Sequence, residues 1–91
     1  MSEIRYKVPS NFAVEEADAF REKISQWLKE GAKSFVLDFS ECTFIDSTGL
    51  GVLVTLYKKC GEKKNAVQLL GVKPQVKRVF ELTRLDGIFG M

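Results

Sequence analysis

The stretch at residues 44–53, FIDSTGLGVL, decides the fold expected of this chain. Two apolar residues lead into Asp46 and Ser47, and both of these residue types are favoured as the N-cap of a helix. Apolar residues then recur at the three- and four-residue spacing of one buried helix face. The stretch therefore predicts a strand-to-helix turn that presents Ser47, followed by a helix over about residues 48–60.

The sequence on either side alternates between strand-like and helix-like patterns. Residues 4–8 alternate apolar and charged side chains, as in a half-buried strand. From Val14 the apolar spacing indicates an amphipathic helix that ends at Gly31. Residues 34–39 hold a continuous apolar run, which is typical of a strand buried on both faces in a sheet covered by helices. Residues 66–70 indicate a further strand, and a third amphipathic helix follows it.

This alternation predicts an α/β fold in one domain over residues 1–91. We expect a mixed, mostly parallel β-sheet of about four strands with helices packed against it and right-handed crossovers. Loops at the carboxyl ends of parallel strands form the usual functional edge of such sheets, and the Ser47 turn is predicted to lie on that edge.

The composition excludes several classes of function. The net charge of +2 does not indicate a nucleic-acid-binding protein. Four lysines around a turn, at positions 58, 59, 63 and 64, fit a solvated helix end that the helix dipole favours. Because the chain has no histidine, it can build neither a Ser-His-Asp triad nor a His-ligated metal site. We expect no metal, no cofactor and no catalytic residues.

The cysteines and the apolar segments predict a cytoplasmic protein that does not insert into a membrane. Cys42 and Cys60 form no CxxC motif, and we expect both thiols to be reduced. The first eight residues lack the apolar core of a signal peptide. No apolar run approaches the roughly 18 residues that a membrane-spanning helix needs.

The local chemistry of the turn leaves two roles open for Ser47. One is a structural role as the cap of the following helix. The other is phosphate acceptor, since a phosphate adds roughly −1.5 to −2 charges, enough to abolish an association at a contact surface. Such a phosphate would lie beside the positive helix end but also beside Asp46, which opposes it. Gly49 and Gly51 leave room for close approach, either by a partner or by packed backbone.

The same motif, following the strand Phe35-Val36-Leu37-Asp38-Phe39, resembles the STAS domain of bacterial anti-sigma-factor antagonists. The likeness continues through residues 72–80 and 85–89 and covers about residues 14–89. It implies a STAS-like protein that binds an anti-sigma-factor serine kinase and thereby releases a sigma factor. It further implies that the kinase phosphorylates Ser47, with Thr48 as the less favoured acceptor. Phosphorylation switches binding off, and a serine phosphatase restores it.

The resemblance also implies a partner surface on the second helix and its neighbouring loops. Its predicted residues are Asp46, Ser47, Thr48, Gly49, Leu50, Val52, Leu53 and Leu56. Two departures favour an alternative, in which the chain is a STAS-type regulatory subunit of a transporter or lipid-export complex. An acidic position of the family falls on Ala13, and both terminal regions are shorter than usual. The shorter N-terminal region is expected to leave a sheet edge exposed, which would permit a homodimer.

Three other classes have weaker support. An enzyme with Ser47 as nucleophile needs a base, and the candidates Lys58 and Lys59 lie roughly 15 Å away along a helix. An acyl carrier would share an Asp-Ser helix start, but such carriers are usually strongly acidic helical bundles. A direct nucleotide site would require the third glycine of a dinucleotide fingerprint or the lysine of a P-loop, and the motif has neither.

Overall fold

The computed structural model describes residues 3–91, and it contains every strand and helix that the sequence indicates. The elements in chain order are β1 (Glu3–Lys7), β2 (Asn11–Phe12), α1 (Val14–Lys29), β3 (Ser34–Asp38), β4 (Phe44–Ile45), α2 (Ser47–Lys59), β5 (Val67–Leu70) and α3 (Pro74–Leu82). The helix predicted over residues 48–60 thus begins one residue earlier, at Ser47.

The strands form two parallel sheets. A three-stranded sheet has the order β1-β3-β5, and a separate two-stranded sheet joins β2 to β4. The predicted α/β class is confirmed, although the described residues form five strands in two sheets, where the sequence predicted about four strands in one. All three strand pairs are parallel, with no antiparallel pair among residues 3–91. The cause is the connectivity, since a helix separates the two strands of each pair and returns the chain to the same end.

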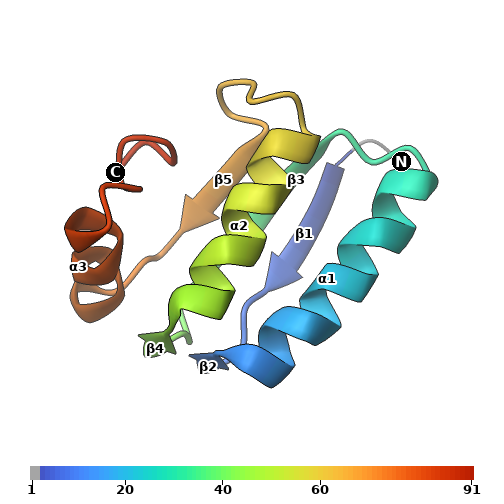
Figure 1. Ribbon diagram of the computed structural model, residues 1–91. Helices are drawn as coiled ribbons and strands as arrows, with labels where there is room; N and C mark the ends of the chain where they lie inside the picture. The colour runs from blue at the N-terminus through green and yellow to red at the C-terminus, as the bar shows by residue number, and fades with distance from the viewer. Residues whose placement is uncertain (1–2) are drawn as a thin grey trace.

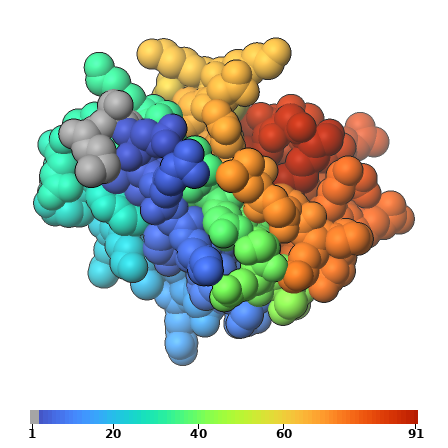
Figure 2. All heavy atoms as spheres, turned by 180° about the vertical axis from the view of Figure 1, so that it is seen from behind, coloured from blue at the N-terminus to red at the C-terminus, as the bar shows by residue number. Residues whose placement is uncertain are grey.

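Helices α1 and α2 lie side by side across one face of the three-stranded sheet (Figure 1). Seen from behind, the opposite face has β1 and β5 at the molecular surface, with no helix crossing them (Figure 2). The prediction of a β3 buried on both faces is confirmed for Phe35, Val36 and Leu37. Val36, whose register partners are Arg5 and Gln68, is buried without a second layer of helices. Long polar side chains on neighbouring strands can cover an apolar residue with their stems.

A network of aromatic rings holds the two sheets and the helices together. The Phe20 ring on α1 lies 4.8 Å from the Tyr6 ring of β1 and 5.6 Å from the Phe12 ring of β2, measured between centroids. Phe39 continues the network from Phe12 to Phe80 on α3, at 6.4 and 6.3 Å. Because β2 is anchored in this core, its partner β4 and the turn that follows are held in place.

Candidate functional site

Asp46 is the N-cap of α2. Its Oδ1 atom accepts hydrogen bonds from the backbone N–H groups of Thr48 at 2.9 Å and Gly49 at 3.0 Å. Ser47 is therefore the first residue inside the helix, and its side chain is exposed. Its hydroxyl makes no hydrogen bond to any other residue in the range 3–91. Of the two roles that the local sequence left open, the capping role belongs to Asp46, and the Ser47 hydroxyl is free at the surface.

The two glycines of the motif have different surroundings. A Cβ atom on Gly49 would lie 2.9 Å from Ile45 Cγ1 and 2.9 Å from the Phe12 ring, and closer still to the Phe12 carbonyl oxygen. Gly49 is thus the point where α2 packs against the backbone of β2. Gly51 is exposed, and a Cβ atom there would meet nothing within 4 Å. Only Gly51 leaves open space for a partner.

Most of the apolar residues predicted for the partner surface lie in the core, which corrects that part of the prediction. Val52, Leu53 and Leu56 have no exposed surface, and Leu50 is 6% exposed. They occupy the face of α2 that packs toward the rest of the molecule. Gly49 is buried as well, whereas Asp46 and Thr48 are half-buried and Ser47 is exposed. The accessible part of the predicted surface is therefore the start of α2.

Two exposed apolar residues that the motif analysis did not select lie at this end of the molecule. Phe44, on β4, is 52% exposed, and Val14, the first residue of α1, is 53% exposed. Both helices begin at the same end because α1 follows β2, α2 follows β4, and these two strands are paired. The sequence did contain a signal for the exposure of Phe44. Successive side chains of a strand point to opposite faces, so Phe44 points outward where Ile45 points into the core.

Two carboxylates near the ends of β1 and β3, those of Asp38 and Glu41, accept hydrogen bonds from nearby groups. The backbone N–H of Ser40 donates to Asp38 at 2.8 Å, and this bond lowers the pKa of the carboxyl group. Lys7 donates to Glu41 at 3.1 Å, and this carboxylate raises the pKa of the ammonium group. Burial raises the pKa of the Cys42 thiol, which donates weakly to the Phe44 carbonyl at 3.4 Å. Each of these three hydrogen bonds involves a residue of the segment 38–44, which leads into the Ser47 turn.

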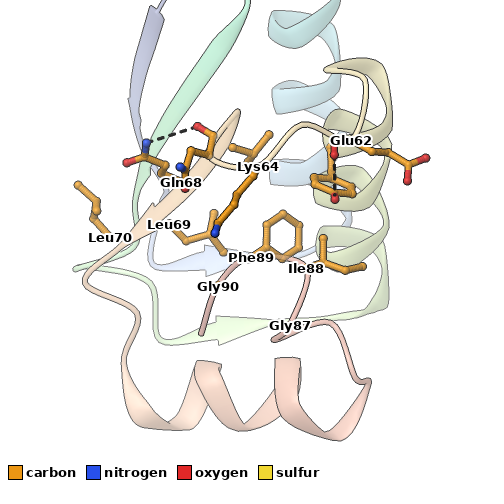
Figure 3. Close-up of a pocket in the computed structure, with 12 residues that line it drawn as sticks. Glu62, Lys64, Gln68, Leu69, Leu70, Gly87, Ile88, Phe89 and Gly90 are labelled. Carbon is orange, nitrogen blue, oxygen red and sulfur yellow. Dashed lines mark hydrogen bonds between the residues drawn. The ribbon is translucent and has the colours of Figure 1, made fainter.

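A cavity of about 440 Å³ lies elsewhere, between β5 and the C-terminal segment (Figure 3). Its labelled lining includes Lys64, Leu69 and Phe89, and it contains none of the residues of the Ser47 turn. Within residues 3–91 no three His, Cys, Asp or Glu side chains are grouped as metal ligands would be. Over the same range, each helix is too short or too polar to span a bilayer.

Comparison with known proteins identifies the family. The STAS domain description matches residues 4–91. This chain belongs to the STAS domain family. The observed α/β architecture with its parallel strands and three helices agrees with that assignment. The residues at the centre of the predicted resemblance lie within the matched range.

The curated STAS relatives are distant. An anti-sigma-B factor antagonist of Listeria monocytogenes is 36% identical over 52 residues, which are 57% of this chain and 46% of that protein. The match therefore spans less than half the length of the Listeria relative. An anti-sigma-B factor antagonist of Staphylococcus aureus is 27% identical over 82 residues, covering 90% of this chain and 76% of the relative.

Solved structures share the fold at low sequence identity. The anti-sigma factor antagonist SpoIIAA in its unphosphorylated form superposes with a TM-score of 0.83 at 21% identity, over 96% of this chain and 77% of SpoIIAA. The phosphorylated form of the Bacillus cell fate determinant SpoIIAA gives a TM-score of 0.69 at 20% identity, over 89% of this chain and 74% of that structure. A sulfate transporter family protein from Wolinella succinogenes gives a TM-score of 0.80 at 20% identity, over 97% of this chain and 71% of that structure.

Proposed function

We propose that this STAS domain is an anti-sigma-factor antagonist that acts by binding and is not itself an enzyme. In this proposal it binds an anti-sigma-factor serine kinase in the cytoplasm and so releases a sigma factor. Phosphorylation of Ser47 switches the binding off, and a serine phosphatase restores it. The observation that carries the proposal is the Ser47 hydroxyl, which is exposed and unbonded directly after the capping Asp46. Thr48 is the alternative acceptor, and it is half-buried.

The surface around Ser47 that we propose for partner contact differs from the one predicted from the motif. It comprises the exposed residues Val14, Phe44, Ser47, Gly51 and Thr55. Apolar side chains on this surface gain free energy when a partner removes them from water. A phosphate on Ser47 would add charge to the same surface, and its desolvation would oppose docking.

The cap geometry supports a switch that acts through charge. Asp46 already accepts the N–H groups of Thr48 and Gly49, which a bound anion at a helix start would otherwise use. A phosphate on Ser47 therefore competes with a capping carboxylate for these donors, and both carry negative charge. Its charge is left at the surface, where the cost of removing it from water opposes docking.

The test combines candidate anti-sigma kinases from the same genome with the protein and ATP. Intact mass should show one added phosphate on the wild-type protein and none on Ser47→Ala. Ser47→Ala should bind the unreacted kinase as the wild-type protein does, whereas Ser47→Asp should bind far more weakly. Unmodified Ser47 together with equal binding by Ser47→Asp would contradict the switch.

A pair of glycine substitutions tests the contact surface. A Cβ atom would meet nothing within 4 Å at Gly51 or at Gly87, so both sites accept a side chain without a clash. Gly51→Gln should block kinase binding because it fills the space beside Ser47. Gly87→Gln, in the C-terminal segment, is the matched control and should bind normally. Equal binding by the two variants would place the partner elsewhere.

The second candidate is a regulatory subunit of a transporter or lipid-export complex, again acting by protein binding. Its support is the structural likeness to the Wolinella sulfate transporter family protein. Co-purification with a transporter, together with no phosphate on Ser47, would favour this candidate. A homodimer is compatible with either function, since the outer edges of β1 and β5 have no strand neighbour among residues 3–91. Analytical ultracentrifugation would measure it.

A further inference from the structure

Five lysines gather at the end of the molecule opposite Ser47. We name this group the basic cap: Lys29, Lys33, Lys58, Lys59 and Lys63. Both α1 and α2 end there, and the loop from α2 to β5 lies beside them (Figure 1). With 13 residues, α2 separates the basic cap from Ser47 by about 20 Å. The first two lysines come from a part of the chain about thirty residues before the others.

A cavity brings the two groups of lysines together. It has a volume of about 350 Å³ and is lined by Leu28, Ala32, Lys33, Lys59, Cys60, Gly61 and Lys63. Three ammonium-bearing side chains thus surround a hollow whose other lining residues are uncharged. The geometry leaves this site electropositive and open to solvent.

The positive charge of the basic cap is not balanced by ion pairs. Each ion pair found within residues 3–91 involves other cations, namely Arg5, Lys7, Arg21 and Arg78. Two acids, Glu30 and Glu62, share these segments, and the Glu30 carboxylate accepts a hydrogen bond from Gln26 at 2.9 Å.

Helix dipoles explain only part of the basic cap. They favour cations in the last turn of a helix, which accounts for Lys29, Lys58 and Lys59. Lys33 and Lys63 lie beyond the helix ends.

We propose that the basic cap binds the surface of a bilayer that contains anionic phospholipids. A cluster of four to eight basic residues is the usual size for such electrostatic attachment. All five cations are lysines, which act as mobile, hydrated point charges and suit a fluid layer of headgroups. Arginine would be preferred for a fixed, bidentate contact. The basic cap includes none of the exposed large apolar residues, so the protein rests on the headgroups without insertion.

The opposite end of the molecule complements this attachment. Glu15 and Glu16 lie in the first turn of α1, and Asp46 lies at the start of α2. Lys7, which is paired with Glu41, ends β1 there and Lys73 follows β5, so the charge of that end is mixed, and an anionic surface attracts the basic cap more strongly. Bound in this orientation, the protein presents Ser47 to the aqueous phase. The attachment does not depend on the function proposed above.

The test measures sedimentation of the full chain with vesicles of phosphatidylcholine, with and without phosphatidylglycerol. The wild-type protein should bind only the anionic vesicles, and rising salt should release it. Simultaneous replacement Lys33→Gln, Lys59→Gln and Lys63→Gln should weaken binding on the order of 100-fold. A control that removes three charges elsewhere, Lys7→Gln, Lys73→Gln and Lys77→Gln, should weaken it by less than roughly 10-fold. Thermal melts check that both variants fold.

Three results would overturn the proposal. One is the absence of wild-type binding to anionic vesicles at low salt. Another is equal loss of binding in the two triple variants, which would assign the effect to net charge alone. The third is tighter binding to duplex DNA or to a polyglutamate peptide than to the vesicles at the same salt, which would give the basic cap a different polyanion.

Discussion

Asp46 and Ser47 are neighbours at one helix start, and only Asp46 bonds to the helix backbone. The sequence could not separate them, since aspartate and serine are about equally good N-cap residues. The outcome depends on where the chain leaves β4. Asp46 keeps the extended conformation of an N-cap, with φ of −114° and ψ of −174°, and Ser47 is already helical.

This division predicts different stability effects for two adjacent substitutions. Asp46→Ala should destabilise the protein by about 1 kcal/mol, because two N–H groups lose their acceptor. Its melting temperature should fall by about 4–8 °C. Ser47→Ala should change the free energy of unfolding by less than about 0.5 kcal/mol. Urea denaturation measures both, and a larger loss in Ser47→Ala would show that Ser47 is the cap.

At the scale of the element, α2 has one face that is buried and one that is accessible. Its apolar spacing predicted the buried face correctly, as Leu53 and Leu56 lie in the core. The family resemblance assigned the same residues to partner contact, and side chains with no exposed surface make such contact only if the packing around them changes. The face of α2 that is accessible as the protein stands carries Ser47, Gly51 and Thr55.

The two glycines of α2 give a matched test of its packing. Gly49→Ala should destabilise the protein by about 1–3 kcal/mol, because the new methyl group meets Phe12 and Ile45. Gly51→Ala should stabilise it by about 0.5–1 kcal/mol, because alanine favours an exposed helix position. Thermal and urea unfolding of the two variants provide the measurement. Effects of the same sign would mean that β2 does not pack on Gly49.

At the scale of the whole molecule, the core determines which surfaces remain free. The helices cover one face of the three-stranded sheet, and the other face remains at the surface (Figure 2). Parallel sheets usually have both faces covered, and the apolar run in β3 fits that rule. The apolar run did not predict that one face of the sheet has no helix across it, because Val36 is buried even so.

Substitutions at two neighbouring residues of α2, one buried and one exposed, should differ in their effect on the free energy of unfolding. Leu56→Ala should cost about 2–5 kcal/mol, because it leaves a cavity at a side chain with no exposed surface. Thr55→Ala, at the exposed neighbour, should change stability by less than about 0.5 kcal/mol. Denaturation and kinase-binding measurements should be made on the same samples. Lost binding with unchanged stability in Leu56→Ala would return this residue to the partner surface.

The sequence by itself determined the order and type of the longer elements, though not the two-residue strand β2, and the place of the Ser47 turn between a strand and a helix. These features follow from periodicity and capping preferences, which depend on residues within one or two helical turns. Only the tertiary structure decided that Gly49 packs against β2 and that the lysines after α1 join those after α2. Such features arise from contacts between segments distant in the chain, so no local pattern encodes them.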